Sequence, residues 1–282
     1  MPEACCDAAR AAGLAQAGTA TRARRWLLLE APGRWGRDVV EDNDLPDGVA
    51  ALLRDWLART PDARALFVRR RGRRRARPLA FLAETTEAGG ELRRLELESL
   101  DALGELDLAR AGELVDEPLV LVCTHGRRDA CCARRGLPVH DALARALPAH
   151  LLWQSSHHGG HRFAANVLVL PAGIQLGQVE PDEARVVAET LRAGRIPLHR
   201  YRACTLHPPH AQAADAAVRA ARGLDRVGDV SVVSTADGVV RVRVPDGEVE
   251  VEVAELEGPL LPPSCGAAPE PTTLYAATLR RP

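Results

Sequence analysis

The chain has 282 residues, of which 46% are hydrophobic, and its formal net charge is −1. This size and apolar content suffice for one large or two medium folded domains. The near-zero charge argues against a general nucleic-acid-binding protein, and no apolar run reaches the roughly 18 residues of a membrane span. The first residues carry an early acid and lack the basic and apolar regions of a secretory signal, so a cytoplasmic protein is expected.

Residues 1–112 predict an N-terminal α/β unit. Residues 25–30 predict a buried strand, and Pro46 stands where a helix with an apolar face begins. An arginine-rich segment, residues 69–77, is expected at the tip of a hairpin. The further strands expected in this unit lie at residues 63–68, 79–83 and 92–100. The order strand, helix, strand, strand, strand predicts a sheet covered by a helix.

Residues 113–204 predict a second α/β unit. Its first strand, residues 118–122, is continuously apolar and therefore expected to be fully buried. The further elements expected here are a helix at 129–147, a strand at 150–154, a hairpin at 165–179 and a helix at 181–192. Residues 205–282 predict a small α+β segment, with a helix at 210–222, strands at 230–234, 239–244 and 248–255, and a loop at 258–271.

Two motifs in the middle unit carry potential metal ligands. Cys123 and Cys132 are separated by eight residues after one strand, and His157 and His161 are separated by three residues after the next. Thiolates and neutral imidazoles are ligands of zinc, copper and iron–sulfur centres. The glycines between the histidines favour a loop that brings the two rings together. The four residues therefore predict one metal site, with Cys131 as an alternative ligand to Cys132. His158 is expected to contact the ligands without binding the metal itself.

The tract from Cys123 through Tyr201 resembles the sucrase/ferredoxin-like family, which belongs with the thioredoxin-like ferredoxins. Three segments carry the resemblance: CTHGRRDACCARRGLPV, HHGGH and NVLVLPAGIQLGQVEPDEARVVAETLRAGRIP. It implies a thioredoxin-like ferredoxin fold for residues 113–204 and favours Cys132 over Cys131, because Cys132 occupies the Cys-Ala-x-Arg-Gly position. From element order, residues 1–112 are expected to form a degenerate second thioredoxin-like layer.

The resemblance also implies a cofactor and a function. Cys123 and Cys132 would bind one iron of a [2Fe–2S] cluster, and His157 and His161 would bind the other. Such Rieske-like ligation raises the reduction potential, to roughly −150 to +300 mV in Rieske centres, and allows proton-coupled electron transfer. An electron carrier with unidentified donor and acceptor proteins is therefore expected, in preference to a stand-alone enzyme.

Three alternatives remain open at this point. A Cys2His2 set can bind structural zinc in an interaction module without redox activity. The adjacent pair Cys131–Cys132 would serve a thiol–disulfide oxidoreductase, although the Cys-x-x-Cys spacing is absent. Sucrase activity is not expected, because no pair of carboxylates suits a glycosidase. The other cysteines have no partner spacing and are interpreted as small apolar residues: Cys5, Cys6, Cys204 and Cys265.

Overall fold

The computed structural model describes residues 4–31, 33–43, 45–70 and 77–280, and its fold class is α/β, as the sequence predicts. The N-terminal part contains a short helix α1 (Cys5–Ala11) and a longer helix α2 (Asp47–Arg59). Pro46 precedes α2 and an acid lies in its first turn, where it complements the helix dipole. The strands are β1 (Arg25–Glu30), β2 (Ala63–Arg69), β3 (Leu79–Glu84), β4 (Glu91–Glu96) and β5 (Glu113–Leu114), with a 3₁₀ helix at Leu100–Glu105.

Strands β2 and β3 do not form the hairpin that the sequence predicts. β1 lies between them, parallel to β2 and antiparallel to β3. The prediction was wrong because β1, distant in sequence, offers both strands a fully buried partner, Trp26–Leu29. Residues 71–76 of the expected arginine-rich tip lie outside the described residues.

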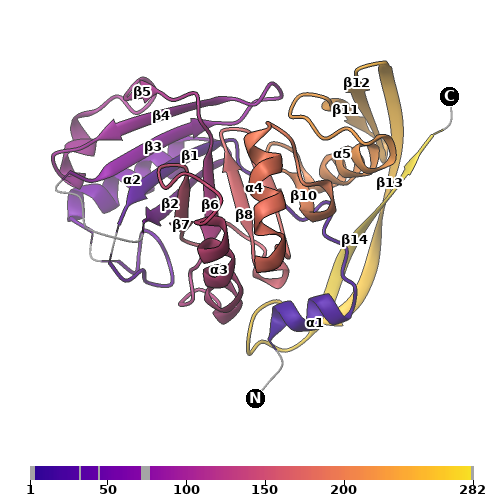
Figure 1. Cartoon of the computed structure of the whole chain (residues 1–282), viewed down its shortest axis with the longest axis horizontal. Helices are drawn as coiled ribbons and strands as arrows, with labels where there is room; N and C mark the ends of the chain where they lie inside the picture. The colour runs from indigo at the N-terminus through magenta and orange to yellow at the C-terminus, as the bar shows by residue number, and fades with distance from the viewer. Residues whose placement is uncertain (1–3, 32, 44, 71–76, 281–282) are drawn as a thin grey trace.

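The middle part contains the two strands after which the metal-ligand motifs stand. β6 (Leu119–Cys123) is buried throughout and runs parallel to β7 (Leu152–Ser155), with helix α3 (Ala130–Leu143) between them in the chain. β8 (Val167–Leu170) and β9 (Ile174–Leu176) form the expected hairpin. Helix α4 (Ala184–Arg192) follows, then the unpredicted strand β10 (Tyr201–Cys204). The helices α3 and α4 lie side by side over this part of the sheet (Figure 1).

The C-terminal part contains helix α5 (Pro209–Arg222) and four antiparallel strands: β11 (Ser231–Ala236), β12 (Val239–Val244), β13 (Gly247–Leu261) and β14 (Glu270–Leu279). In β12 the valines alternate with arginines, and the valines face α5. Most of the predicted loop at residues 258–271 lies outside the strands, at residues 262–269. Its ends are strand, because β13 continues to Leu261 and pairs with β14, which begins at Glu270. A register shift between Glu257 and Leu260 accommodates Pro259 in this ladder.

Ten strands form one curved sheet that crosses the predicted boundary at residue 112. Its order is β10-β9-β8-β6-β7-β2-β1-β3-β4-β5, and β2 pairs with β7 through Val68–Ser155 and Arg69–Gln154. One apolar cluster on this sheet contains residues of both halves, among them Trp26, Phe81 and Trp153. The division into units at 1–112, 113–204 and 205–282 stays a prediction.

Helix α1 lies far from the N-terminal strands. It packs beside the loop that joins β13 and β14, at the edge of the molecule where α3 begins (Figure 1). Helix α1, the start of α3 and the β13–β14 loop, which are distant in sequence, therefore meet beside the Cys and His motifs.

Candidate metal centre

Cys123 and Cys132 approach each other because α3 begins close to the end of β6. Asp129 caps α3 and accepts a hydrogen bond from the backbone N–H of Cys131 at 2.9 Å. Gly136, one turn after Cys132, faces the strand end: a Cβ atom there would stand 2.0 Å from the carbonyl oxygen of Cys123. Only glycine permits this approach of helix to strand.

His157 joins the two cysteines because β6 and β7 are parallel neighbours. Cys123 is in register with Ser155, so the chain after β7 passes the Cys123 side chain. The Nδ1 atom of His157 lies 3.5 Å from Sγ of Cys132 and 3.9 Å from Sγ of Cys123. These three ligand atoms lie within 4.8 Å of one another, which suits them to hold a metal ion.

His161 lies next to His157 but outside the group of three ligand atoms, and it has one free ring nitrogen. Its Nε2–H donates a hydrogen bond to the carbonyl of Pro263, so in the neutral ring Nδ1 carries the lone pair. That Nδ1 atom is buried and has no hydrogen-bond partner among the described residues. The rings of His157 and His161 are 5.2 Å apart between centroids. His161 thus has the tautomer that a metal at Nδ1 requires, and the Nδ1 of His157 faces the two thiols.

The loop that carries the histidines is held by residues of the motifs and by two residues outside them. Gly160 adopts φ +73°, a left-handed conformation, as the glycines of the motif favour. The amide of Asn166 donates to the Gly160 carbonyl at 2.8 Å, and the fully buried guanidinium of Arg202 donates to Asn166 Oδ1 at 2.9 Å. Thr21 Oγ1 donates to the His158 carbonyl at 2.7 Å. Thr21 and Arg202 have no recognisable spacing to the predicted ligands, so only the fold reveals them.

Two further histidines, His158 and His125, form hydrogen bonds that hold the loop in place. His158 is fully buried, and its Nδ1 accepts a hydrogen bond from the Gln175 amide at 2.9 Å. His125 Nδ1 accepts a hydrogen bond from the His157 backbone N–H at 3.2 Å, while its Nε2–H donates to the Gly36 carbonyl. His125 therefore fixes the position of His157.

The electrostatics of the site treat the two thiols differently. A hydrogen bond with the Cys132 thiol lowers the pKa of Cys123 well below its usual value, with burial opposing and His157 assisting. The same hydrogen bond and burial raise the pKa of Cys132 well above its usual value. Burial lowers the pKa of His161 and of His125. One thiolate and a neutral His161 are therefore favoured near neutral pH, and metals bind these forms.

A cavity of about 340 Å³ gives access to the site from one side. His157 and His125 line it together with Arg22, Arg37, Arg64 and Arg128. Arg64 is half-buried, and both burial and the charge of Arg128 lower its pKa. A partly exposed ligand thus stands at the base of a cavity rich in positive charge.

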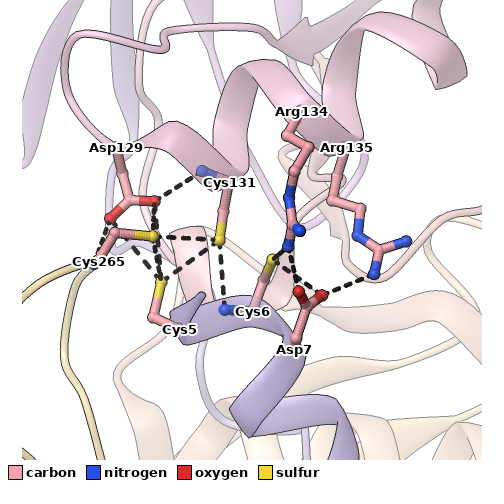
Figure 2. A network of polar contacts seen from close by, with 8 residues as sticks. All are labelled: Cys5, Cys6, Asp7, Asp129, Cys131, Arg134, Arg135 and Cys265. Atoms are coloured by element: carbon pink, nitrogen blue, oxygen red, sulfur yellow. Dashed lines mark hydrogen bonds and ion pairs between the residues drawn. The ribbon is translucent and has the colours of Figure 1, made fainter. Parts of the chain in front are cut away.

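Cys131 belongs to a different group from its neighbour. Its Sγ lies 3.6 Å from Sγ of Cys5 and 3.5 Å from Sγ of Cys265, beside Asp129 (Figure 2). Cys5 and Cys265 are free thiols in an apolar cluster, as the sequence predicts, and the tertiary structure also brings both to Cys131. Cys6 lies in the same apolar cluster, and Cys204 donates to the Ala172 carbonyl elsewhere.

The comparison with protein families finds one family whose model matches this chain. The sequence pattern described as "Sucrase/ferredoxin-like" matches residues 16–203, which is more than half of the chain. The chain belongs to the sucrase/ferredoxin-like family. The match covers the ten-stranded sheet from β1 into β10 and includes all four predicted ligands.

Two curated fungal proteins are similar to this family member. Both bear the name "Altered inheritance of mitochondria protein 32". The protein of Meyerozyma guilliermondii is 26% identical over 117 residues, 38% of this chain and 42% of its own length. That of Debaryomyces hansenii is 33% identical over 98 residues, 31% of this chain and 36% of its own length. The chain thus spans less than half the length of these relatives.

No solved structure matches the chain. Among the described residues, no helix is long and apolar enough to span a membrane.

Proposed function

We propose that this sucrase/ferredoxin-like protein transfers electrons with one [2Fe–2S] cluster, held by Cys123, Cys132, His157 and His161. The observation that carries the proposal is the buried, unpartnered Nδ1 of His161, which lies beside a His157 whose Nδ1 faces two thiols. Two thiolates and two neutral imidazoles form a donor set that iron–sulfur centres use. When bound, the cluster supplies reversible one-electron chemistry.

The chain's own residues give the two histidines different roles. The Pro263 carbonyl holds the Nε2–H of His161, which fixes that ring and retains its proton. His157 is partly exposed and lines the arginine-rich cavity, so its Nε2–H is the group placed for proton exchange with solvent. The same cavity favours donor and acceptor proteins with an acidic surface.

The proposal is tested on protein purified without oxygen. Iron and zinc are counted per chain, and visible absorption and EPR spectra are recorded before and after reduction. We expect two irons per chain and a signal of mixed His and Cys ligation. Cys123→Ser should lose the iron, and His157→Cys or His161→Cys should move the spectra towards those of an all-Cys cluster.

The matched control is His150→Ala, since His150 is exposed and pairs only with Glu117 among the described residues. It should keep both the iron and the spectra. Wild-type protein that contains no iron after anaerobic cluster reconstitution would contradict the electron-transfer proposal.

A structural zinc site is the second candidate. For a tetrahedral ion with Zn–S near 2.3 Å and Zn–N near 2.0–2.1 Å, the S···N separation is about 3.6 Å. The measured separations of 3.5 and 3.9 Å at His157 are close to this value. One zinc per chain, lost in Cys123→Ser, together with no visible absorption would assign this function.

Thiol–disulfide exchange between Cys131 and Cys132 has no support from the geometry. The two thiols face different partners, Cys5 and Cys265 in one case and His157 in the other. The cytoplasmic location stays a prediction; the names of the relatives concern mitochondria and say nothing of this chain's compartment.

A further inference from the structure

A second group of potential metal ligands lies at the start of α3. Cys5 comes from α1, Cys131 and Asp129 from the start of α3, and Cys265 from the loop between β13 and β14 (Figure 2). Their ligand atoms all lie within 4.8 Å of one another. The sequence motifs assign no function to Cys5 and Cys265, and the electron-transfer proposal uses none of these four residues.

The three sulfur atoms form a nearly regular triangle. The Sγ–Sγ distances are 3.6 Å for Cys5–Cys131, 3.5 Å for Cys131–Cys265 and 3.8 Å for Cys265–Cys5. A tetrahedral zinc ion with Zn–S near 2.3 Å separates its sulfurs by about 3.8 Å. A disulfide needs two sulfurs at about 2.05 Å and would leave the third unused. The triangle therefore fits one shared ion better than a disulfide.

Asp129 supplies the fourth potential ligand. Its Oδ1 lies 3.2 Å from Sγ of Cys265 and 3.8 Å from Sγ of Cys5. A tetrahedral zinc with three sulfurs and one carboxylate oxygen predicts S···O separations of about 3.6 Å. The backbone N–H groups of Cys131 and Cys265 donate to this carboxylate at 2.9 Å each, so its orientation is fixed.

Two local features favour a thiolate at Cys131, against the neighbouring Cys5 thiol and burial, which raise the pKa of Cys131 above its usual value. The backbone N–H of Cys6 donates to Sγ of Cys131 at 3.3 Å. Cys131 also lies in the first turn of α3, where the helix dipole favours a thiolate. Cys265 is partly exposed, which leaves a path for an ion from solvent.

We propose that Cys5, Cys131, Cys265 and Asp129 form a second, structural metal site that binds one zinc ion. Binding displaces the protons of the three thiols and involves no change of oxidation state. The ion joins α1, the start of α3 and the β13–β14 loop. That loop also carries Pro263, the residue whose carbonyl holds His161, so the zinc stabilises the neighbouring centre.

The experiment counts zinc and iron per chain in full-length protein exposed to excess zinc and then desalted. Cys5→Ser and Cys265→Ser are compared with wild type, and Cys204→Ser is the matched control, a cysteine outside both groups. We expect one zinc in wild type and in the control. Cys5→Ser and Cys265→Ser should each weaken zinc binding at least about 100-fold in chelator competition and keep most of their iron. This loss exceeds the 10–100-fold that is typical of residues hydrogen-bonded to metal ligands.

A second measurement does not require the variants to fold. Wild-type protein is alkylated with and without zinc, and the modified cysteines are identified by mass spectrometry. Zinc should protect Cys5, Cys131 and Cys265 and leave Cys204 unchanged. Wild type without zinc, an intramolecular disulfide in its place, or zinc lost only in Cys123→Ser would each overturn the second site. A lack of iron with this zinc retained would contradict only the electron-transfer proposal.

Discussion

The contact of Gly136 with the end of β6 gives the sharpest prediction about the centre. In Gly136→Ala the new Cβ would stand 2.0 Å from the Cys123 carbonyl oxygen, where ordinary contact begins at 3.4 Å. The helix must therefore move away from the strand by 3.4 − 2.0, about 1.4 Å. Ligand positions in metal sites are held within about 0.2 Å. Because Cys132 and Gly136 share one face of α3, this shift separates Cys132 from Cys123.

The effect on stability is the difference between two opposing contributions. Alanine in place of a helical glycine stabilises by about 0.5–1 kcal/mol. Overpacking against a buried backbone costs about 1–3 kcal/mol, so we expect a net destabilisation of about 1–2 kcal/mol together with loss of most of the bound metal.

Urea unfolding and metal analysis check this prediction, with Gly48→Ala as the matched control. Gly48 is also helical, in α2, but a Cβ atom there meets nothing within 4 Å. The control should be stabilised by about 0.5–1 kcal/mol and keep its metal. Gly136→Ala with wild-type stability and full metal content would refute the argument that this close approach positions Cys132.

Two further predictions concern residues around the centre. Arg202→Met should lower the free energy of unfolding by about 3 kcal/mol or more, because buried acceptors such as Asn166 Oδ1 lose a charged donor; urea unfolding that matches wild type would contradict this. Asp7→Asn tests the contact of α1 with α3, since hydrogen bonds from Arg135 and Arg134 lower the pKa of Asp7 to about 2. A lowered carboxyl pKa stabilises the fold above the unfolded value of 3.8, so the difference between wild type and Asp7→Asn should be present at pH 5 and shrink as the pH falls towards 2. A difference that does not vary with pH would show that the ion pair is not its source.

The regular elements of the middle part were predictable because their signals are local. The apolar run of β6, the hairpin of β8 and β9 and the acid-rich start of α4 each depend on neighbouring residues. Strand order depends on pairing between distant segments, and so the insertion of β1 between β2 and β3 was not predictable. The strand residues 258–261 and 270–271 were predicted as loop for a related reason: proline-rich sequence is typical of a loop unless a partner strand is known.

The sequence alone determined the Cys and His motifs, the resemblance to the family and the positions of most strands and helices. The resemblance favoured Cys132 over Cys131, and the tertiary structure gave the physical reason: adjacent helical residues point about 100° apart, so one thiol faces His157 and the other faces Cys5. The tertiary structure also brought Cys265 to Cys131 across 134 residues. Spacing along a chain can indicate ligands that neighbouring loops supply, whereas ligands from distant segments become visible only when the fold places them together.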